Sequence, residues 1–143
     1  MEFIVSKIEA AVEQLDWSIR LFLDQRAFIP AITLAGAAEE LIGRSVGEQA
    51  AFLLLMRKLS QQYDLPERIV SHAHLNKAKN WLKHWDNQKD SATLTIELEN
   101  EAVQYIVRAL ANLVEHDNSL PSEGPRFLEW LRRNRSDLMP CVP

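Results

Sequence analysis

The sequence has little of several residue types that would define a site or a compartment. Its 143 residues include one cysteine, Cys141, and only four glycines. A single thiol excludes an intramolecular disulfide and a zinc site built from several thiolates, and it suits a reducing compartment. The sequence also has no glycine-rich phosphate loop, no nucleophile elbow and no Cys–His pair. Nucleophilic catalysis therefore has no evident candidate.

Positive charge and long apolar runs are also scarce. The formal net charge is −4 and the pI is about 5.6, so the chain has no surplus of basic residues with which to coat nucleic acid, although it can still carry a local basic site. The longest apolar stretch, residues 28–38, is too short to span a bilayer, and the N-terminus lacks the pattern of a signal peptide. We expect a soluble cytoplasmic protein without a membrane partner.

The sequence does contain strong helical periodicity. Its length and 47% hydrophobic content suit one domain, expected over residues 1–138 with a tail at 139–143. Apolar side chains at helical spacing predict an all-α, single-domain bundle of four to five main helices. A short C-terminal helix around Phe127, Trp130 and Leu131 is expected to cap it. The main helices are expected at residues 3–25, 30–43, 48–63, 71–86, and from 96 or 98 to 115.

The second predicted helix, residues 30–43, is small or apolar on nearly every side, which favours a central position in the bundle. Pro30 suits its first turn, where a missing N–H costs nothing. Glu39 lies on its small-residue face and needs a partner, since an unpaired buried charge is expensive. Glu39 either forms a structural ion pair at the rim, with Arg108 or a lysine of residues 71–86, or orients a site.

The segment of residues 71–86 concentrates titratable and aromatic side chains, with three of the four histidines and two of the four tryptophans of the chain. As one helix, it places Asn76, Asn80 and His84 on a single polar face. A second, apolar face is expected from the side chains of Leu75, Ala78, Leu82 and Trp85. The loop that follows, to about residue 95, lies beside the His84 end.

The spacing of possible ligands argues against two kinds of metal site. No glutamate is followed by histidine three residues later, as a di-iron bundle requires. His72 and His74, two residues apart on a helix, point in different directions and cannot chelate one zinc ion unless the helix unwinds, so a zinc site is disfavoured. We therefore expect neither a metal nor another cofactor.

One candidate for acid–base chemistry remains, a histidine imidazole with neighbouring cations. His84 can exchange protons near neutral pH, while Lys79, Lys83 and the Asn80 amide can hold an anionic oxygen. The alternative is structural: His84 interacts with the helix dipole and Asp86, with Trp81 and Trp85 as core or interface aromatics. The arginines of the C-terminal helix are similarly open to two interpretations, a solvated face or a phosphate site; they are Arg126, Arg132, Arg133 and Arg135.

The residues Lys79, Asn80 and His84 resemble the motif of the HEPN family, in which an arginine is followed by a polar residue and, five positions after the arginine, by a histidine. The resemblance implies a helical bundle, a two-fold dimer whose motifs meet in one cleft, and metal-independent RNA cleavage through the ribose 2′-hydroxyl. His84 would then transfer protons, Lys79 would stand for the arginine, and Asn80 would match the polar residue. The family's upstream acid would correspond to Glu39 or Glu40.

This sequence departs from the family at Lys79, because lysine lacks the planar fork with which arginine grips a phosphate. Family members without an intact motif are often binding or regulatory modules, and the chain is also similar to uncharacterised bacterial bundle proteins. Two hypotheses follow. The chain is an endoribonuclease of toxin or defence type with His84, Lys79 and Asn80 as catalytic residues and Asn76, Lys83 and Glu39 contacting the substrate. Alternatively it is a non-catalytic module that binds a protein, RNA or a nucleotide.

Overall fold

The computed structural model describes residues 1–85 and 91–138, and within them the chain is all α-helical with no strand, as predicted. The helices are α1 (Lys7–Gln25), α2 (Phe28–Val46), α3 (Ala51–Tyr63), α4 (Glu67–Ile69), α5 (Lys77–Lys83), α6 (Leu98–Asp117) and α7 (Gly124–Asn134). Short 3₁₀ turns at Gly47–Gln49 and Ser136–Leu138 and a π-helix at Val70–Leu75 complete the described elements.

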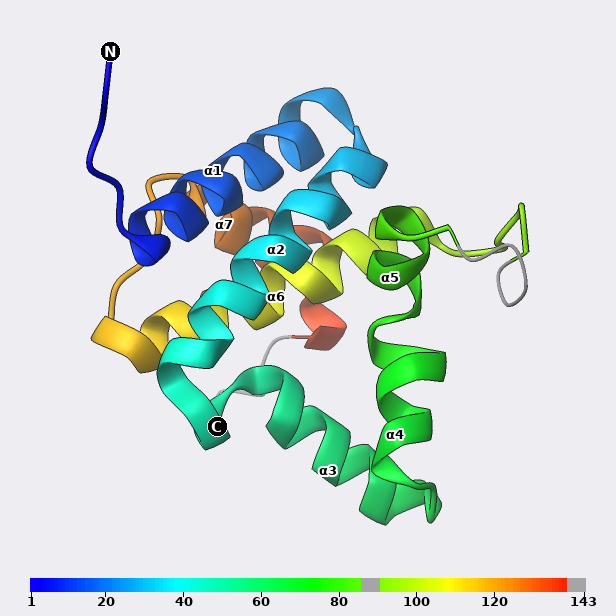
Figure 1. Cartoon of the computed structure of the whole chain (residues 1–143). Coiled ribbons are helices and arrows are strands. Elements are labelled where there is room, and N and C mark those ends of the chain that lie inside the picture. Colours follow the sequence, from blue (N-terminus) through cyan, green and yellow to red (C-terminus); the bar gives the residue numbers. More distant parts are fainter. Residues whose placement is uncertain (86–90, 139–143) are drawn as a thin grey trace.

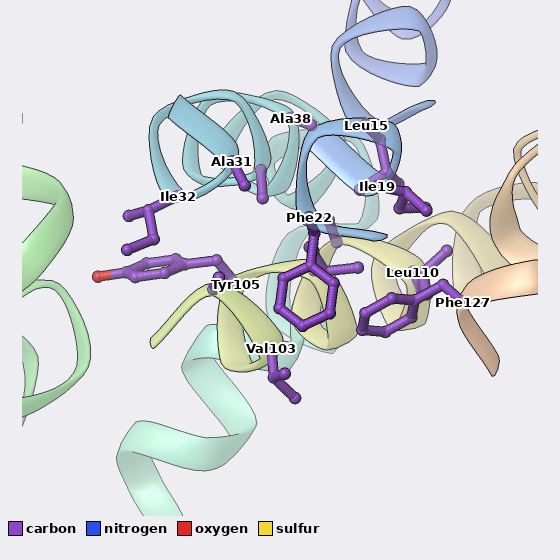
Figure 2. Close-up of a cluster of buried hydrophobic side chains, with 14 of the residues drawn as sticks. Leu15, Ile19, Phe22, Ala31, Ile32, Ala38, Val103, Tyr105, Leu110 and Phe127 are labelled. Atoms are coloured by element: carbon purple, nitrogen blue, oxygen red, sulfur yellow. The ribbon is translucent and has the colours of Figure 1, made fainter. Parts of the chain in front are cut away.

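Helix α2 lies at the centre of the bundle, as its small and apolar composition predicted. It packs against α1 on one side and α6 on the other, with α5 against its outer surface (Figure 1). Figure 2 shows the resulting core, in which Leu15, Ile19 and Phe22 of α1 meet side chains of α2 and α6 and the Phe127 ring of α7. The predicted capping helix is therefore present and contributes an aromatic ring to the core.

Helix α1 starts later than the predicted residue 3. Ser6 accepts a hydrogen bond from the backbone N–H of Glu9 at 3.1 Å, and the Glu9 carboxylate accepts one from the Ser6 N–H at 2.7 Å. This reciprocal capping box fixes the start of the helix at Lys7. Residues 1–6 precede it without regular structure and expose apolar side chains, among them Phe3 and Ile4.

Helix α2 continues past Gly43, where the sequence predicted its end. It closes three residues later at Val46, followed by Gly47 with φ of +58°, a conformation that glycine adopts without strain. Pro30 does lie in the first turn, as predicted. The extra turn includes Arg44, which pairs with Glu40 one turn earlier in α2.

The prediction of one helix over residues 71–86 is wrong. The π-helix Val70–Leu75 ends at Asn76, whose φ of −114° and ψ of 7° interrupt the helix before α5 begins at Lys77. His84 follows α5 in an extended conformation, with φ of −126° and ψ of 148°. Asn76, Asn80 and His84 consequently do not form one continuous helical face. Part of the predicted loop, residues 86–90, and the predicted tail, residues 139–143, lie outside the described residues.

Helices α3 and α4 extend away from the main bundle (Figure 1). A second, small apolar cluster joins α3 to the π-helix that follows α4; it is built on Met56, Val70 and Leu75, with partly buried leucines and Phe52 of α3 around it. No helix in the described part of the chain combines the length and the apolar character needed to cross a bilayer.

Candidate functional site

The interruption at Asn76 is held by two side chains of α6. The Tyr105 hydroxyl donates to the Leu75 carbonyl at 2.9 Å and accepts from the backbone N–H of Lys79 at 3.2 Å. Arg108 Nη1 donates to the same Leu75 carbonyl at 3.2 Å. In Figure 2 the Tyr105 hydroxyl points away from the Phe22 and Phe127 rings. Side chains from α6 thus satisfy backbone groups that a continuous helix would have paired internally.

Arg108 also reaches α2. Its Nη2 lies 3.2 Å from Glu39 Oε2, and the two side chains are only 5% and 4% exposed. The guanidinium carbon stacks 4.4 Å from the centroid of the Tyr105 ring and 5.9 Å from that of Phe52. The predicted Glu39–Arg108 ion pair is therefore confirmed, but it is buried rather than placed at a rim.

Asn112 connects the start of α3 to the backbone of Glu39. Its amide nitrogen donates to the Glu39 carbonyl at 3.1 Å and its amide oxygen accepts from the Ala51 N–H at 2.7 Å. Tyr105, Arg108 and Asn112, polar residues that recur at helical spacing along α6, are 0%, 4% and 1% exposed. They form a buried polar strip that positions α3, α5 and Glu39.

Lys79 crosses the surface of α2 at a glycine. A Cβ added to Gly36 would lie 2.6 Å from Lys79 Cδ and 2.9 Å from its Cγ, so only glycine leaves room for this stem. The Lys79 side chain is 9% exposed, and its Nζ lies 3.7 Å from Glu40 Oε2. The sequence predicted Lys79 as a cation beside His84, but it gave no sign of the contact with Gly36, which joins residues 43 positions apart.

Glu40 gathers three cations, and together with them it forms what we call the cation cluster. Arg44 Nη2 lies 3.4 Å from Glu40 Oε1, while the Nζ atoms of Lys79 and Lys83 lie 3.7 and 3.9 Å from Oε2. Burial alone would raise the pKa of the Glu40 carboxyl, but Lys79, Arg44 and Lys83 outweigh it and hold that pKa below its usual value. Glu40, rather than Glu39, is the acid that meets the motif lysine.

A cavity of about 470 Å³ opens beside the cation cluster, between α2 and α3. Its apolar or small lining residues are Gly43, Gly47, Ala50, Phe52 and Leu53. Its polar lining residues are Glu39, Glu40, Arg44, Glu48, Asn76 and Lys79. We call this the α2–α3 cavity. The side-chain oxygen of Asn76 is inaccessible to solvent and has no hydrogen-bond partner among the described residues.

A separate hollow of about 280 Å³ lies at the end of α5, and we call it the His84 hollow. It is lined by Trp81, Leu82, Lys83, His84, Trp85 and Ser91. Trp81 Nε1 donates to the Ser91 carbonyl at 2.9 Å, which fixes one indole against the following segment. His84 is exposed and Trp85 is 72% exposed. An imidazole, an ammonium and two indoles thus share one open surface.

The structure divides the predicted site residues between these two places. Lys79 and Asn76 line the α2–α3 cavity, whereas His84 and Lys83 line the His84 hollow. Asn80 lines neither; its carbonyl accepts the His84 backbone N–H at 3.1 Å and helps to close α5. Lys83 connects the two places, because its Nζ also approaches Glu40. The sequence did not single out Arg44, although its spacing of four residues from Glu40 was a usable signal.

The basic helix α7 is neutralised by acidic neighbours. Arg126 donates to both carboxylate oxygens of Asp24, at 2.6 and 2.8 Å, and also contacts Glu123. Arg132 and Arg133 both contact Glu129, and hydrogen bonding from Arg132 lowers the pKa of the Glu129 carboxyl to about 2. Arg135 pairs with Asp137. These ion pairs favour the interpretation of α7 as a solvated, charge-paired face.

Within residues 1–85 and 91–138, no group of three or more histidine, cysteine, aspartate or glutamate side chains is arranged to hold a metal ion. Comparison with protein-family models, with curated proteins and with solved structures finds no match to this chain. Function is therefore inferred from the residues and their geometry.

Proposed function

We propose that this protein binds single-stranded RNA at the His84 hollow and cleaves it without a metal ion, acting as a homodimer. The observation that carries the proposal is the exposed His84 ring, which shares one hollow with Lys83 and the indoles of Trp81 and Trp85. The motif formed by Lys79, Asn80 and His84, which resembles that of the HEPN family, is the second support.

The hollow offers the two kinds of contact that single-stranded nucleic acid uses. Bases stack on exposed aromatic side chains, and Trp85 presents most of its surface to solvent. The Lys83 ammonium, with its side chain 37% exposed, can approach a backbone phosphate. The net charge of −4 disfavours binding over the whole surface, so binding would be confined to this place.

The proposed reaction needs two histidines with opposite protonation. The neutral imidazole of one His84 takes the proton of a ribose 2′-hydroxyl, and the 2′ oxygen forms a bond to the adjacent phosphorus. The bond from that phosphorus to the 5′ oxygen of the next nucleotide breaks, and this oxygen takes a proton from the protonated His84 of a second copy. The products are a 2′,3′-cyclic phosphate and a 5′-hydroxyl.

In this proposal Lys83, rather than Lys79, is the cation that acts with His84. Lys79, which occupies the position of the family's arginine, is 9% exposed and directed to the α2–α3 cavity, whereas Lys83 lines the hollow with His84. A lysine contacts phosphate as a point charge and does not form the bidentate grip of arginine. We therefore propose a slow nuclease with Lys83 as the phosphate-contacting cation and Lys79 in a supporting role.

A non-catalytic interaction module is the second candidate, and the burial of Lys79 favours it. A motif cation already 3.7 Å from Glu40 is poorly placed to neutralise a substrate phosphate. In this case Trp81, Trp85 and Lys83 would form a contact surface for a protein, or for RNA that is held and not cleaved. Large aromatic side chains near the centre of an interface contribute most of its binding energy.

The experiment that separates the two candidates uses 5′-labelled single-stranded RNA incubated with the purified protein in EDTA. The nuclease proposal expects products that end in a 2′,3′-cyclic phosphate, and their loss in His84→Ala. His74→Ala is the matched control, because His74 is also exposed but lies in the π-helix, away from the hollow. Cleavage that persists in His84→Ala contradicts the proposal. Intact RNA that binds the wild type and is released by Trp85→Ala favours the second candidate.

A further inference from the structure

A nearly buried lysine side chain lines the α2–α3 cavity. Lys79 is the more buried of the two lysines of the cation cluster, and within residues 1–85 and 91–138 the carboxylate oxygen that its Nζ approaches is Glu40 Oε2, at 3.7 Å. Among the described residues the ammonium makes no hydrogen bond within 3.5 Å; only the backbone N–H of Lys79 does, to Tyr105. A buried cation without close acceptors is costly. An anion in the cavity would supply the missing acceptors.

The burial of Lys79 is built into the fold. Gly36 removes the one Cβ that would collide with the lysine stem, and Tyr105 fixes the lysine backbone. The Lys79 stem is therefore held between its own backbone and the surface of α2, and Lys79 lines the cavity. Side chains held in this way lose little further entropy when they bind a ligand.

The net charge around the Lys79 end of the cavity is positive. Glu39 is neutralised by Arg108 at 3.2 Å, so it does not oppose an incoming anion strongly. Glu40 is one carboxylate shared by three cations, at 3.4 to 3.9 Å. Glu48, the remaining acid of the lining, belongs to the exposed turn after α2. A second anionic group beside Glu40 would find Arg44, Lys79 and Lys83 around it.

The apolar part of the lining suits an apolar body. It consists of Phe52, Leu53 and Ala50, together with the glycines at positions 43 and 47. The cavity volume of about 470 Å³ lies within the range of roughly 300–1,000 Å³ common for small-molecule sites.

We infer that the α2–α3 cavity binds a small organic anion, an apolar or aromatic body that carries one phosphate or carboxylate. The anionic group lies against Lys79 and Arg44, and the apolar body lies against Phe52 and Leu53. This site is distinct from the His84 hollow, and it does not depend on RNA cleavage. Its ligand would stabilise the contact between α3 and the bundle, because the cavity lies between α2 and α3.

Calorimetric titration with four defined probes tests the inference: phenyl phosphate, benzoate, inorganic phosphate and benzylamine. We expect phenyl phosphate or benzoate to bind and to raise the melting temperature, with inorganic phosphate at least about tenfold weaker because it lacks the apolar body. The two aromatic acids distinguish a phosphate from a carboxylate ligand. Binding of benzylamine as tight as that of the acids, or no binding of either acid, overturns the inference.

Two substitutions localise the binding. Lys79→Met keeps the stem beneath Gly36 and removes the charge, and it is expected to weaken the bound probe at least about tenfold. Lys77→Met, an exposed lysine of the same helix, is the control and should leave binding unchanged. Leu53→Trp fills the cavity from the apolar wall and should abolish binding even if Lys79→Met fails to fold. Unchanged affinity in Leu53→Trp, or equal losses in Lys79→Met and Lys77→Met, overturns the site.

Discussion

Arg108 and Glu39 form an ion pair at 3.2 Å in which both side chains are at least 95% buried. Arg108 also donates to the Leu75 carbonyl, and the Glu39 backbone carbonyl accepts from Asn112. The pair therefore connects α2, α6 and the end of the π-helix. A buried ion pair of this kind gives less net stability than its Coulomb energy suggests, but the loss of one partner leaves the other charge unpaired.

Glu39→Gln is expected to lower the free energy of unfolding by about 3–5 kcal/mol, because it leaves the Arg108 guanidinium without its counter-charge. Urea denaturation measures the change. Glu13→Gln is the control, because Glu13 is an exposed glutamate of α1, and a loss of at most about 0.5 kcal/mol is expected. Equal losses in the two variants would show that the buried ion pair contributes no more to the free energy of unfolding than an exposed carboxylate does.

Tyr105→Phe is expected to cost about 1–3 kcal/mol, because it leaves the buried Lys79 N–H without an acceptor at the start of α5. The Leu75 carbonyl keeps its bond from Arg108, so the loss is confined to one backbone group. Tyr63→Phe, at a residue that is 62% exposed, should change stability by less than about 0.5 kcal/mol. Hydrogen exchange of the Lys79 amide provides a local measurement; unchanged protection in Tyr105→Phe would contradict the assignment.

The sequence predicted the helices whose apolar stripe is simple. The stripe of α1, with Leu15 and Ile19 at its centre, and the cluster around Phe127 in α7 give the fold class directly. The burial of the polar strip of α6 could not be predicted from the local sequence, for a physical reason. Tyr105, Arg108 and Asn112 recur at helical spacing as solvent-facing residues do, and only the position of α3 and α5 over that strip makes it buried.

The site was harder to predict because it depends on pairs distant in sequence. The end of the π-helix at Asn76 is stabilised by Tyr105, 30 residues after Leu75, and propensity along residues 71–86 gives no sign of it. The direction of Lys79 depends on Gly36 in another helix. The short motif therefore indicated the right segment, but the chain's local pattern does not determine that Lys79 and His84 line different cavities.

Gly36→Ala is expected to lower stability by about 1–3 kcal/mol, because the new methyl group would lie 2.6 Å from Lys79 Cδ. A double-mutant cycle with Lys79→Ala isolates this collision. In the Lys79→Ala background the same change should cost nothing or stabilise the protein by up to about 1 kcal/mol, since alanine is the better helix former. The same cost in both backgrounds would rule out the contact as its cause.

The raised pKa of the Glu101 carboxyl should be detectable in the pH dependence of stability. Burial raises the pKa of the Glu101 carboxyl, against the attraction of Arg108, so the folded state holds its proton to higher pH than the unfolded state does. Stability should therefore fall as the pH rises from the ordinary glutamate pKa through the raised one. Glu101→Gln removes this loss, and denaturation at several pH values should find it equal to the wild type in acid and more stable at neutral pH.

Glu129→Gln provides the control of opposite sign. Hydrogen bonds from Arg132 lower the pKa of the Glu129 carboxyl to about 2, so its contribution is present above the ordinary glutamate pKa and is lost as the pH falls toward 2. The Glu129→Gln variant should be slightly less stable than the wild type at neutral pH and equal to it in acid. A difference of the same sign for the two glutamates would contradict both assignments.

Trp85→Ala should weaken single-stranded RNA binding by about 1–3 kcal/mol if a base stacks on this indole, as the proposed RNA site requires. Trp85 is 72% exposed, so its removal should hardly affect folding. Trp17→Ala is the matched control, because Trp17 is 50% exposed on α1 and stacks on Arg20 at 5.0 Å, away from the hollow. Fluorescence anisotropy with a labelled oligonucleotide measures both, and equal effects would exclude a specific stack.

Lys83→Ala should lower the salt dependence of RNA binding as well as the affinity. Each phosphate neutralised by a lysine contributes about 0.7 to the slope of log affinity against log salt for a single strand, so the loss of one contact should reduce the slope by about that amount. Lys58→Ala, an exposed lysine of α3, is the control and should leave the slope unchanged. Titrations at several salt concentrations separate this electrostatic contact from a loss of stacking, which would lower affinity at every salt concentration alike. A slope unchanged by Lys83→Ala would mean that the phosphate is held elsewhere, with Lys79 and Arg44 of the cation cluster as the next residues to test.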